Sequence, residues 1–266
     1  MYIHNLDPVL LDFGLLVIRW YSLAYIFGIV LGWWLGKKII KNLLENVNFK
    51  FDLKEFDDLI TYLIISIILG GRLGYVFFYN FEYYISNLFD IIKVWEGGMS
   101  FHGALIGIIV GTYIFSIKKN VPTFFFLDVI ACVSPIGIFF GRIANFINGE
   151  LVGKVTEMPW GVVFPSLDML VRHPSQLYEA FLEGVILFLL LNANILKRRY
   201  KIGFSSSLFL IFYGFFRIIA EQFREPDYQI GYFFGNLSMG TLLSTIMIIF
   251  GFIILIVLRK KNEIKF

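Results

Sequence analysis

The sequence predicts an all-α polytopic membrane protein with about seven transmembrane helices. Hydrophobic residues fill 58% of its 266 positions and charged residues only 16%, whereas a soluble domain carries about a quarter charged residues. The apolar residues come in runs of about 20, the length at which a helix crosses a bilayer. Helices are expected because backbone polar groups in lipid must be satisfied within the segment, and the alternation typical of a membrane β-barrel is missing from the sequence.

Hydropathy predicts the seven spans at residues 17–36, 59–79, 98–117, 124–141, 175–196, 204–223 and 236–258. No basic residue precedes the first span, so it lacks the start of a cleavable signal peptide and is expected to remain as a helix. We expect one integral membrane domain, residues 1–266, with external loops near 80–97 and 142–174. The second of these loops is long enough to predict a functional role.

Basic residues alternate between the connections and predict the orientation. The first, third and fifth loops and the C-terminal tail hold fifteen Lys and Arg residues, and the N-terminus and the other loops hold five. The positive-inside rule then predicts an external N-terminus and a cytoplasmic C-terminus. This orientation requires an odd number of spans, which seven satisfies.

Three arginines, Arg19, Arg72 and Arg217, fall inside the predicted spans, where an ionisable group costs about 2.5–3.5 kcal/mol on insertion scales. At about 1.5 Å per residue, Arg72 and Arg217 would lie roughly 10 Å below the outer boundary. Other segments bring further polar residues to the outer ends of their spans, namely Tyr21, His102 and Arg142. The sequence therefore predicts one polar layer near the outer face.

The sixth predicted span carries Tyr213, Arg217, Glu221 and Arg224 on one helical face. One interpretation is a ladder of internal ion pairs whose ends reach toward the interface. The other is an anion site, which the sequence favours because one glutamate cannot neutralise two arginines. The planar guanidinium suits phosphate, and the phosphate available at this depth belongs to a phospholipid headgroup.

Two glycine-rich segments carry the other candidate residues. His102 has glycines on both sides, within residues 97–103, and is either a packing histidine or a general base. Residues 141–153 hold an arginine, two asparagines and a glutamate, more polar groups than a helix cap needs. Cys132 lies in an apolar span and is expected to be inert packing.

These segments resemble the prolipoprotein diacylglyceryl transferase family. Residues 141–153 are similar to its signature, and residues 97–103, 172–179 and 213–227 agree with further family motifs. The resemblance extends from Arg19 to the last span. The departures are Ala104, where a second glycine is common, and Val152, where an aromatic residue is often found; neither removes a polar group.

The resemblance implies an enzyme of the bacterial cytoplasmic (inner) membrane, with its site toward the outer leaflet. The family transfers the diacylglyceryl group of phosphatidylglycerol to the lipobox cysteine of a prolipoprotein signal peptide and releases glycerol 1-phosphate. Neither a metal nor another cofactor is implied, nor a nucleic-acid partner. The catalytic residues would be His102, Arg142 and Arg217. The substrate-binding residues would be Tyr21, Arg142, Asn145, Glu150, Gly153, Glu221 and Arg224.

The chemistry of these side chains fits this reaction. A thiol with a pKa of about 8.5 needs a base at neutral pH, which His102 could supply. Arg142 and Arg217 could stabilise the charge on the departing phosphate. Glu221 and Arg224 would orient Arg217. Asn145 and Glu150 would hold the glycerol hydroxyls or the following loop.

Other function classes remain possible from the residues alone. A phospholipid headgroup or acyl transferase would keep the lipid site and change the acceptor. A transporter or channel also uses buried arginines, although polar groups confined to one depth argue against a continuous pathway. A retinal-type receptor would need a lysine in the last span, and residues 236–258 have none.

Overall fold

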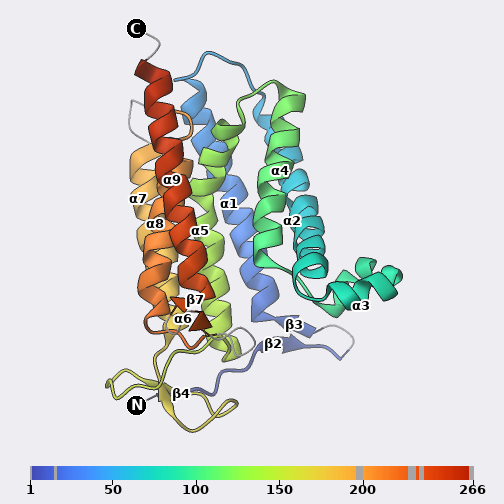
Figure 1. Cartoon of the computed structure of the whole chain (residues 1–266), viewed down its shortest axis with the longest axis vertical. Coiled ribbons are helices and arrows are strands. Elements are labelled where there is room, and N and C mark those ends of the chain that lie inside the picture. The colour runs from blue at the N-terminus through green and yellow to red at the C-terminus, as the bar shows by residue number, and fades with distance from the viewer. Residues whose placement is uncertain (1, 15–16, 196–199, 227–231, 234–236, 264–266) are drawn as a thin grey trace. The chain divides into compact units, whose positions relative to one another are not determined.

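The computed structural model describes residues 2–14, 17–195, 200–226, 232–233 and 237–263 (Figure 1). The chain divides into two compact units. One joins Met1–Ile39 to Asp128–Phe266, and the other is Ile40–Leu127.

The all-α polytopic class is confirmed. Within the described residues, six helices are long and apolar enough to cross a membrane. The third predicted span corresponds to a seventh helix, α4 (Phe101–Lys119). The exact number of spans and the orientation stay predictions, as does the single domain. Lys197, Arg198 and Arg199, which contribute to the predicted orientation, lie outside the described residues.

The larger unit is built on helices that approach closely at small residues. Its helical elements are α1 (Trp20–Leu44, which continues past the unit's boundary), α5 (Thr123–Asn148, from Asp128 onward), α6 (Ser175–Glu179), η4 (Ala180–Ile186), α7 (Leu187–Ile195), α8 (Phe204–Glu221) and α9 (Met239–Glu263). A Cβ added at Gly28 of α1 would lie 3.0 Å from the Cα of Gly137 on α5. One added at Gly214 of α8 would lie 2.7 Å from the carbonyl oxygen of Ser244 on α9. Such close contact is how helices associate in lipid, where no hydrophobic effect drives them together.

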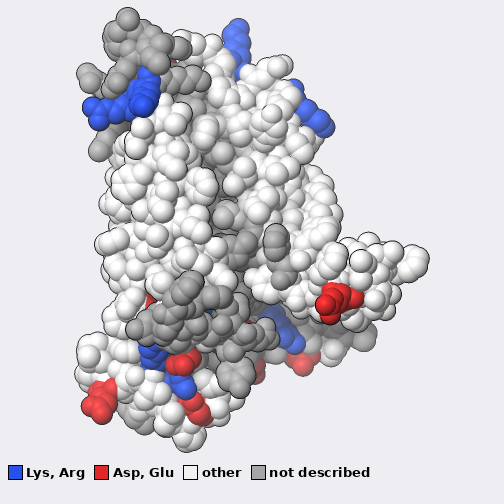
Figure 2. Space-filling view, viewed as in Figure 1, with Lys and Arg blue, Asp and Glu red and all other residues white. Residues whose placement is uncertain are grey.

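The surface of this unit fits a lipid environment. Figure 2 shows a flank along α7, α8 and α9 that is almost without charge, with charged residues near the helix ends. Large apolar side chains such as Leu189, Phe215 and Phe252 are more than half exposed. On a soluble protein such a surface would mark an interaction site. In a membrane protein the lipid chains of the bilayer cover it.

The smaller unit pairs α2 (Phe56–Phe78) with α4, and η1 (Leu53–Glu55) precedes α2. A Cβ at Gly70 or Gly103 would overlap the backbone of the opposite helix, so glycine is required at both positions. Residues 80–97, predicted as a loop, form α3 (Phe81–Ser86), η2 (Leu88–Ile92) and η3 (Val94–Glu96).

Arg72 has a structural role in this unit. It is 4% exposed, and its guanidinium donates hydrogen bonds to the carbonyl oxygens of Asp90, Ile91, Lys93, Gly97 and Gly98. Its planar fork of donors thereby fixes the segment that leads into α4.

Short strands occur outside the helices, where sequence analysis predicted none. β1 (Tyr2–Ile3) pairs in parallel with β4 (Val162–Val163), which pairs antiparallel with β5 (Val171–Arg172). Two antiparallel pairs join β2 (Val9–Asp12) to β3 (Val17–Arg19) and β6 (Tyr232–Phe233) to β7 (Leu237–Ser238). Arg19 therefore ends a strand and precedes α1, so its expected position inside the first span is wrong.

The fourth predicted span also ends too early. α5 continues through Asn148, because Ile143, Phe146 and Ile147 extend the apolar spacing of the helix. It ends where Gly149 adopts a φ of +67°, as glycine commonly does after the last helical residue. Arg142 therefore lies within the helix.

Candidate active site

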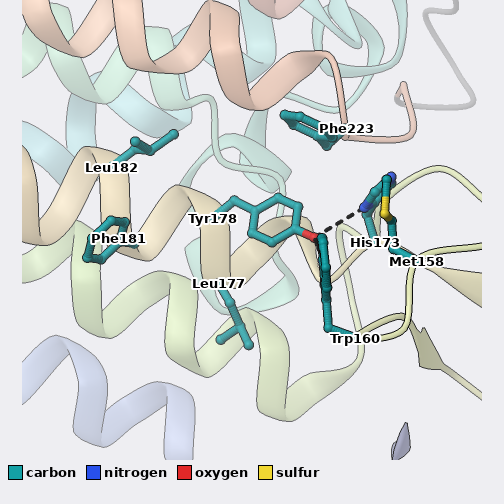
Figure 3. Close-up of a pocket in the computed structure, with 8 residues that line it drawn as sticks. All are labelled: Met158, Trp160, His173, Leu177, Tyr178, Phe181, Leu182 and Phe223. Atoms are coloured by element: carbon teal, nitrogen blue, oxygen red, sulfur yellow. Dashed lines mark hydrogen bonds between the residues drawn. The ribbon is translucent and has the colours of Figure 1, made fainter. Parts of the chain in front are cut away.

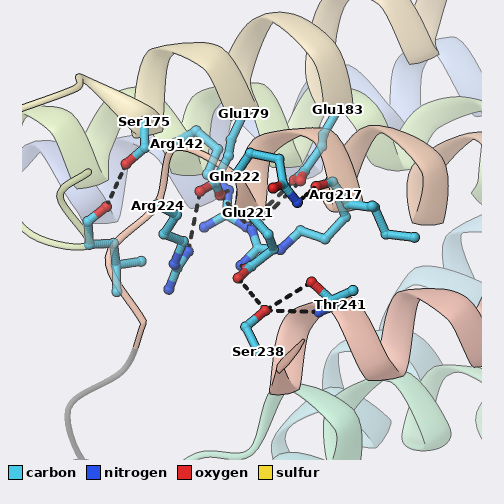
Figure 4. Close-up of polar contacts among 12 residues, drawn as sticks. Arg142, Ser175, Glu179, Glu183, Arg217, Glu221, Gln222, Arg224, Ser238 and Thr241 are labelled. Carbon is cyan, nitrogen blue, oxygen red and sulfur yellow. Dashed lines mark hydrogen bonds and ion pairs between the residues drawn. The ribbon is translucent and has the colours of Figure 1, made fainter. Parts of the chain in front are cut away.

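Arginines and buried glutamates from three helical segments meet in the larger unit (Figure 4). Arg142 of α5 and Arg217 of α8 share one oxygen of Glu179, the last residue of α6: Arg142 Nε lies 2.8 Å and Arg217 Nη1 2.6 Å from Oε2. Arg224, three residues beyond the end of α8, lies 3.3 Å from Oε1 of the same carboxylate. Glu179 is therefore the centre of the cluster, and two of its three partners were predicted to lie on one face of the sixth span.

A second carboxylate lies deeper and is bound less closely. Glu183 is fully buried, and its oxygens lie 3.5 Å from Arg142 Nη2 and 3.6 Å from Arg217 Nη1. Within the described residues neither oxygen has a hydrogen-bond partner. Glu183 belongs to η4, a π-helical stretch, a rare geometry that is often found at functional sites. Gly184 beside it is in close contact with Phe139, which brings η4 against α5.

The third carboxylate is Glu221. Its Oε1 lies 2.6 Å from Arg217 Nη2, and its Oε2 accepts a hydrogen bond of 2.7 Å from the hydroxyl of Ser238, just before α9. The expectation that Glu221 orients Arg217 agrees with this contact. Arg224 reaches Arg217 through the shared carboxylate of Glu179.

The charge excess inferred from the sequence is wrong for this cluster. Among the described residues, three arginines face three glutamates, because Glu179 and Glu183 neutralise charge that the sequence argument left unpaired. Arg72 belongs to the other unit, where it binds backbone carbonyls. The two missed acids are four residues apart in an apolar span, which is itself a signal, since an acid in a span is as costly as a base.

The arginines are nevertheless less deeply buried than the glutamates. The side chains of Arg142 and Arg217 are 18% and 13% exposed, whereas those of Glu179 and Glu183 are 1% and 0% exposed. The two carboxylates are therefore the more deeply buried members of the cluster. Arginine has five N–H donors in a fixed plane, so one guanidinium can bind more than one anion.

The last turn of α5 and the turn after it carry two more of the predicted residues, Asn145 and Glu150. Asn145 donates a hydrogen bond of 2.7 Å from Nδ2 to Glu150 Oε1, and Arg142 Nη1 lies 3.5 Å from Asn145 Oδ1. The side chain of Gln176 donates to the backbone carbonyl of Glu150 at 2.6 Å. Asn145 and Glu150 thus connect the arginine cluster to the start of the following segment.

Gly153 is a site of close backbone approach. Its N–H donates to the carbonyl of His173 at 3.0 Å, and it pairs with Arg224 in an isolated β-bridge. A Cβ at this position would overlap the His173 carbonyl and lie 2.7 Å from that of Phe223. Glycine is therefore needed for packing, and it helps to hold Arg224.

The two remaining predicted residues are not joined to the cluster by the described contacts. Tyr21 lies in the first turn of α1, with its ring 5.2 Å from that of Tyr25. The backbone of His102 lies in the first turn of α4, and its side chain lies outside the described residues. The catalytic role of His102 stays a prediction.

An apolar pocket of about 460 Å³ lies beside α6 (Figure 3). Its lining residues are Met158, Trp160, His173, Leu177, Tyr178, Phe181, Leu182 and Phe223. The hydroxyl of Tyr178 accepts a hydrogen bond of 2.7 Å from Trp160 Nε1 and lies 3.1 Å from His173 Nδ1. Burial lowers the pKa of His173, with a smaller contribution from Lys154, which favours the neutral imidazole. Tyr178 directly precedes Glu179 in α6, so the same helix carries part of the pocket lining and the centre of the arginine cluster.

The chain was compared with known proteins. The family model described as prolipoprotein diacylglyceryl transferase matches residues 8–257. A protein of Rickettsia bellii named phosphatidylglycerol–prolipoprotein diacylglyceryl transferase is 50% identical over 254 residues, which cover 95% of each chain. A protein with the same name from Wolbachia pipientis is 51% identical, over 94% of each chain. Another from Rickettsia felis is 48% identical, over 93% of this chain and 95% of that protein. The chain belongs to the prolipoprotein diacylglyceryl transferase family, a family of membrane transferases.

Proposed function

We propose that this chain transfers the diacylglyceryl group of phosphatidylglycerol to the lipobox cysteine of a prolipoprotein signal peptide. The bond between the glyceryl carbon and the phosphate oxygen breaks, and a bond between that carbon and the cysteine sulfur forms. The thiol proton passes to a base, and the phosphate leaves as glycerol 1-phosphate. We assign the reaction to the outer leaflet of the bacterial cytoplasmic membrane.

The proposal depends on Arg142 and Arg217, whose side chains stay partly exposed at 18% and 13%. Both guanidiniums are held by the buried carboxylate of Glu179, through contacts of 2.8 and 2.6 Å. Their orientation is therefore fixed before substrate binds, which is the condition for stabilising charge that develops on a leaving group. A phosphodiester bound between them would gain negative charge as the carbon–oxygen bond breaks.

The other residues support this pair. Glu221 and Arg224 hold Arg217 through direct and shared contacts. The amide of Asn145 and the carboxylate of Glu150 offer hydrogen-bonding groups for the glycerol hydroxyls beside Arg142. Tyr21 and Gly153 complete the proposed binding residues, Gly153 through the backbone. His102 would accept the thiol proton.

The test is transfer of labelled phosphatidylglycerol into a lipobox peptide, measured with release of glycerol phosphate. Arg142→Lys and Arg217→Lys should each lower kcat by about 100-fold or more at normal protein abundance, since lysine cannot reproduce the planar fork. Arg172→Lys is the matched control, because Arg172 also has close ion pairs, to Asp168 and Glu225, but lies outside the cluster. Equal losses of activity and abundance in the two cluster variants would mean that these arginines are only structural.

The base role of His102 has its own test. His102→Gln should lose most activity at pH 7 and regain part of it at higher pH, where the thiol ionises without help. An unchanged pH–rate profile with near-normal activity would contradict the role. Lipid transport without a covalent product would contradict the transferase proposal as a whole.

A further inference from the structure

The first turn of α9 is in contact with the arginine cluster, although no sequence motif assigned it a role. Ser238, 7% exposed, donates a hydrogen bond of 2.7 Å from its hydroxyl to Glu221 Oε2. The opposite oxygen of that carboxylate lies 2.6 Å from Arg217 Nη2. One carboxylate therefore connects Ser238 to a proposed phosphate ligand (Figure 4).

Gly240 allows this contact to form. A Cβ at position 240 would overlap the carboxylate of Glu221, with its carbon 2.6 Å and its Oε2 3.1 Å away. The neighbour is the end of a flexible side chain rather than backbone. An alanine could therefore be accommodated if the Glu221 carboxylate moved, without unfolding of the helix pair.

We propose that Ser238 and Gly240 are positioning residues that set the orientation of Glu221 and, through it, of Arg217. This inference rests on the proposed phosphate-binding role of Arg217. Glu221 fixes one terminal nitrogen of that guanidinium, and Glu179 fixes the other. Loss of the Ser238 hydrogen bond frees the Glu221 carboxylate to rotate, so one side of the guanidinium loses its support.

Ser238 also caps α9, because its hydroxyl accepts a hydrogen bond of 3.1 Å from the N–H of Thr241. Two substitutions separate the capping of α9 from the hydrogen bond to Glu221. Ser238→Asp keeps an oxygen acceptor for capping, which aspartate does well, but it cannot donate to Glu221 when ionised and adds a repelling charge. Ser238→Thr keeps both the acceptor and the donor.

The experiment measures kcat and KM for phosphatidylglycerol in the full-length protein, together with folded protein in detergent. Ser238→Ala and Ser238→Asp should each lower kcat/KM about tenfold to a hundredfold, the loss expected for a hydrogen bond to a charged group. Ser238→Thr should restore most of the activity. Gly240→Ala should lower kcat/KM to a similar extent while thermal stability stays level or rises, because alanine favours helix more than glycine does.

Thr245→Val on the next turn of α9 is the control, since its hydroxyl donates a hydrogen bond to the backbone carbonyl of Thr241 in the same helix, its one hydrogen bond among the described residues. It should leave activity unchanged.

In a Glu221→Gln background, Ser238→Ala should add little further loss of kcat/KM, because both substitutions act through one carboxylate. Wild-type activity in Ser238→Asp or in Gly240→Ala would overturn the inference and leave the proposed function intact. A wild-type protein without transferase activity would overturn both.

Discussion

Glu179 and Glu183 are two buried glutamates that look alike in the sequence but should contribute differently to stability. Glu179→Gln removes the charge that three arginines contact at 2.6, 2.8 and 3.3 Å. Breaking a buried ion pair from one side costs about 3–5 kcal/mol, because the remaining charge stays buried without compensation. We expect the free energy of unfolding to fall by that amount in Glu179→Gln.

Glu183→Gln should behave differently despite its deeper burial. Its two arginine contacts are 3.5 and 3.6 Å long, and neither carboxylate oxygen has a hydrogen-bond partner in the described part of the chain. Burying a carboxylate costs several kcal/mol, which is recovered only when the geometry is good. In Glu183→Gln the attraction to the two arginines is lost, and the cost of burying the charged carboxylate is relieved. These two effects should nearly cancel, so we expect the free energy of unfolding to change by no more than about 1 kcal/mol.

The assay is unfolding in mixed micelles of increasing SDS content, with the folded fraction measured by pulse proteolysis. Glu225→Gln is the control, because this residue has one ion pair of 3.3 Å to Arg172 and a side chain 51% exposed; surface pairs of this kind contribute about 0–1 kcal/mol. The reasoning is refuted if Glu183→Gln destabilises as much as Glu179→Gln. It is also refuted if Glu179→Gln costs no more than the control.

Three further predictions concern other parts of the structure. Gly153→Ala should reduce folded protein and activity together, because its Cβ would overlap backbone atoms that cannot move freely; separation of the two losses would contradict this. Arg72→Lys should lower stability by about 2 kcal/mol or more and speed protease cleavage within residues 80–97, since lysine cannot bind the same five carbonyls. Hydrogen bonds from Arg172 lower the pKa of Asp168 below its ordinary 3.8. Their stabilisation is present above that ordinary pKa and is lost as pH falls through the lowered pKa. Pepsin cleavage near residue 168 should therefore rise with acid in the wild type and change less in Asp168→Asn.

The helices were largely predictable from the sequence because their physical cause is local. A run of apolar residues must be helical in lipid, so α2, α8 and α9 agree with the predicted spans to within a few residues. The short strands were not predictable in the same way. β1 pairs with β4, about 160 residues away, and two-residue strands leave no periodicity that could be recognised.

Only part of the candidate site was predictable: sequence analysis identified the three arginines and Glu221, but not the acids that balance their charge. Arg217 and Glu221 share a helical face, so their contact follows from spacing alone. Glu179 and Glu183 come from another span, and only the folded chain brings them to Arg142 and Arg217. Ser238 was missed because a serine before an apolar helix predicts only a cap.

Charge balance changes how the proposed anion site would have to work. An unpaired group of arginines would attract phosphate by net charge, but it would also repel itself in a medium of low dielectric. The structure pairs each arginine with a buried carboxylate, while the side chains of Arg142 and Arg217 stay 18% and 13% exposed. Binding at the proposed site would then depend on the direction of N–H donors more than on excess charge. Lysine at position 142 or 217 should therefore lower activity although it keeps the charge. For the same reason Ser238 and Gly240, which contact Glu221, should affect activity: the orientation of Arg217 depends on the contacts that hold it.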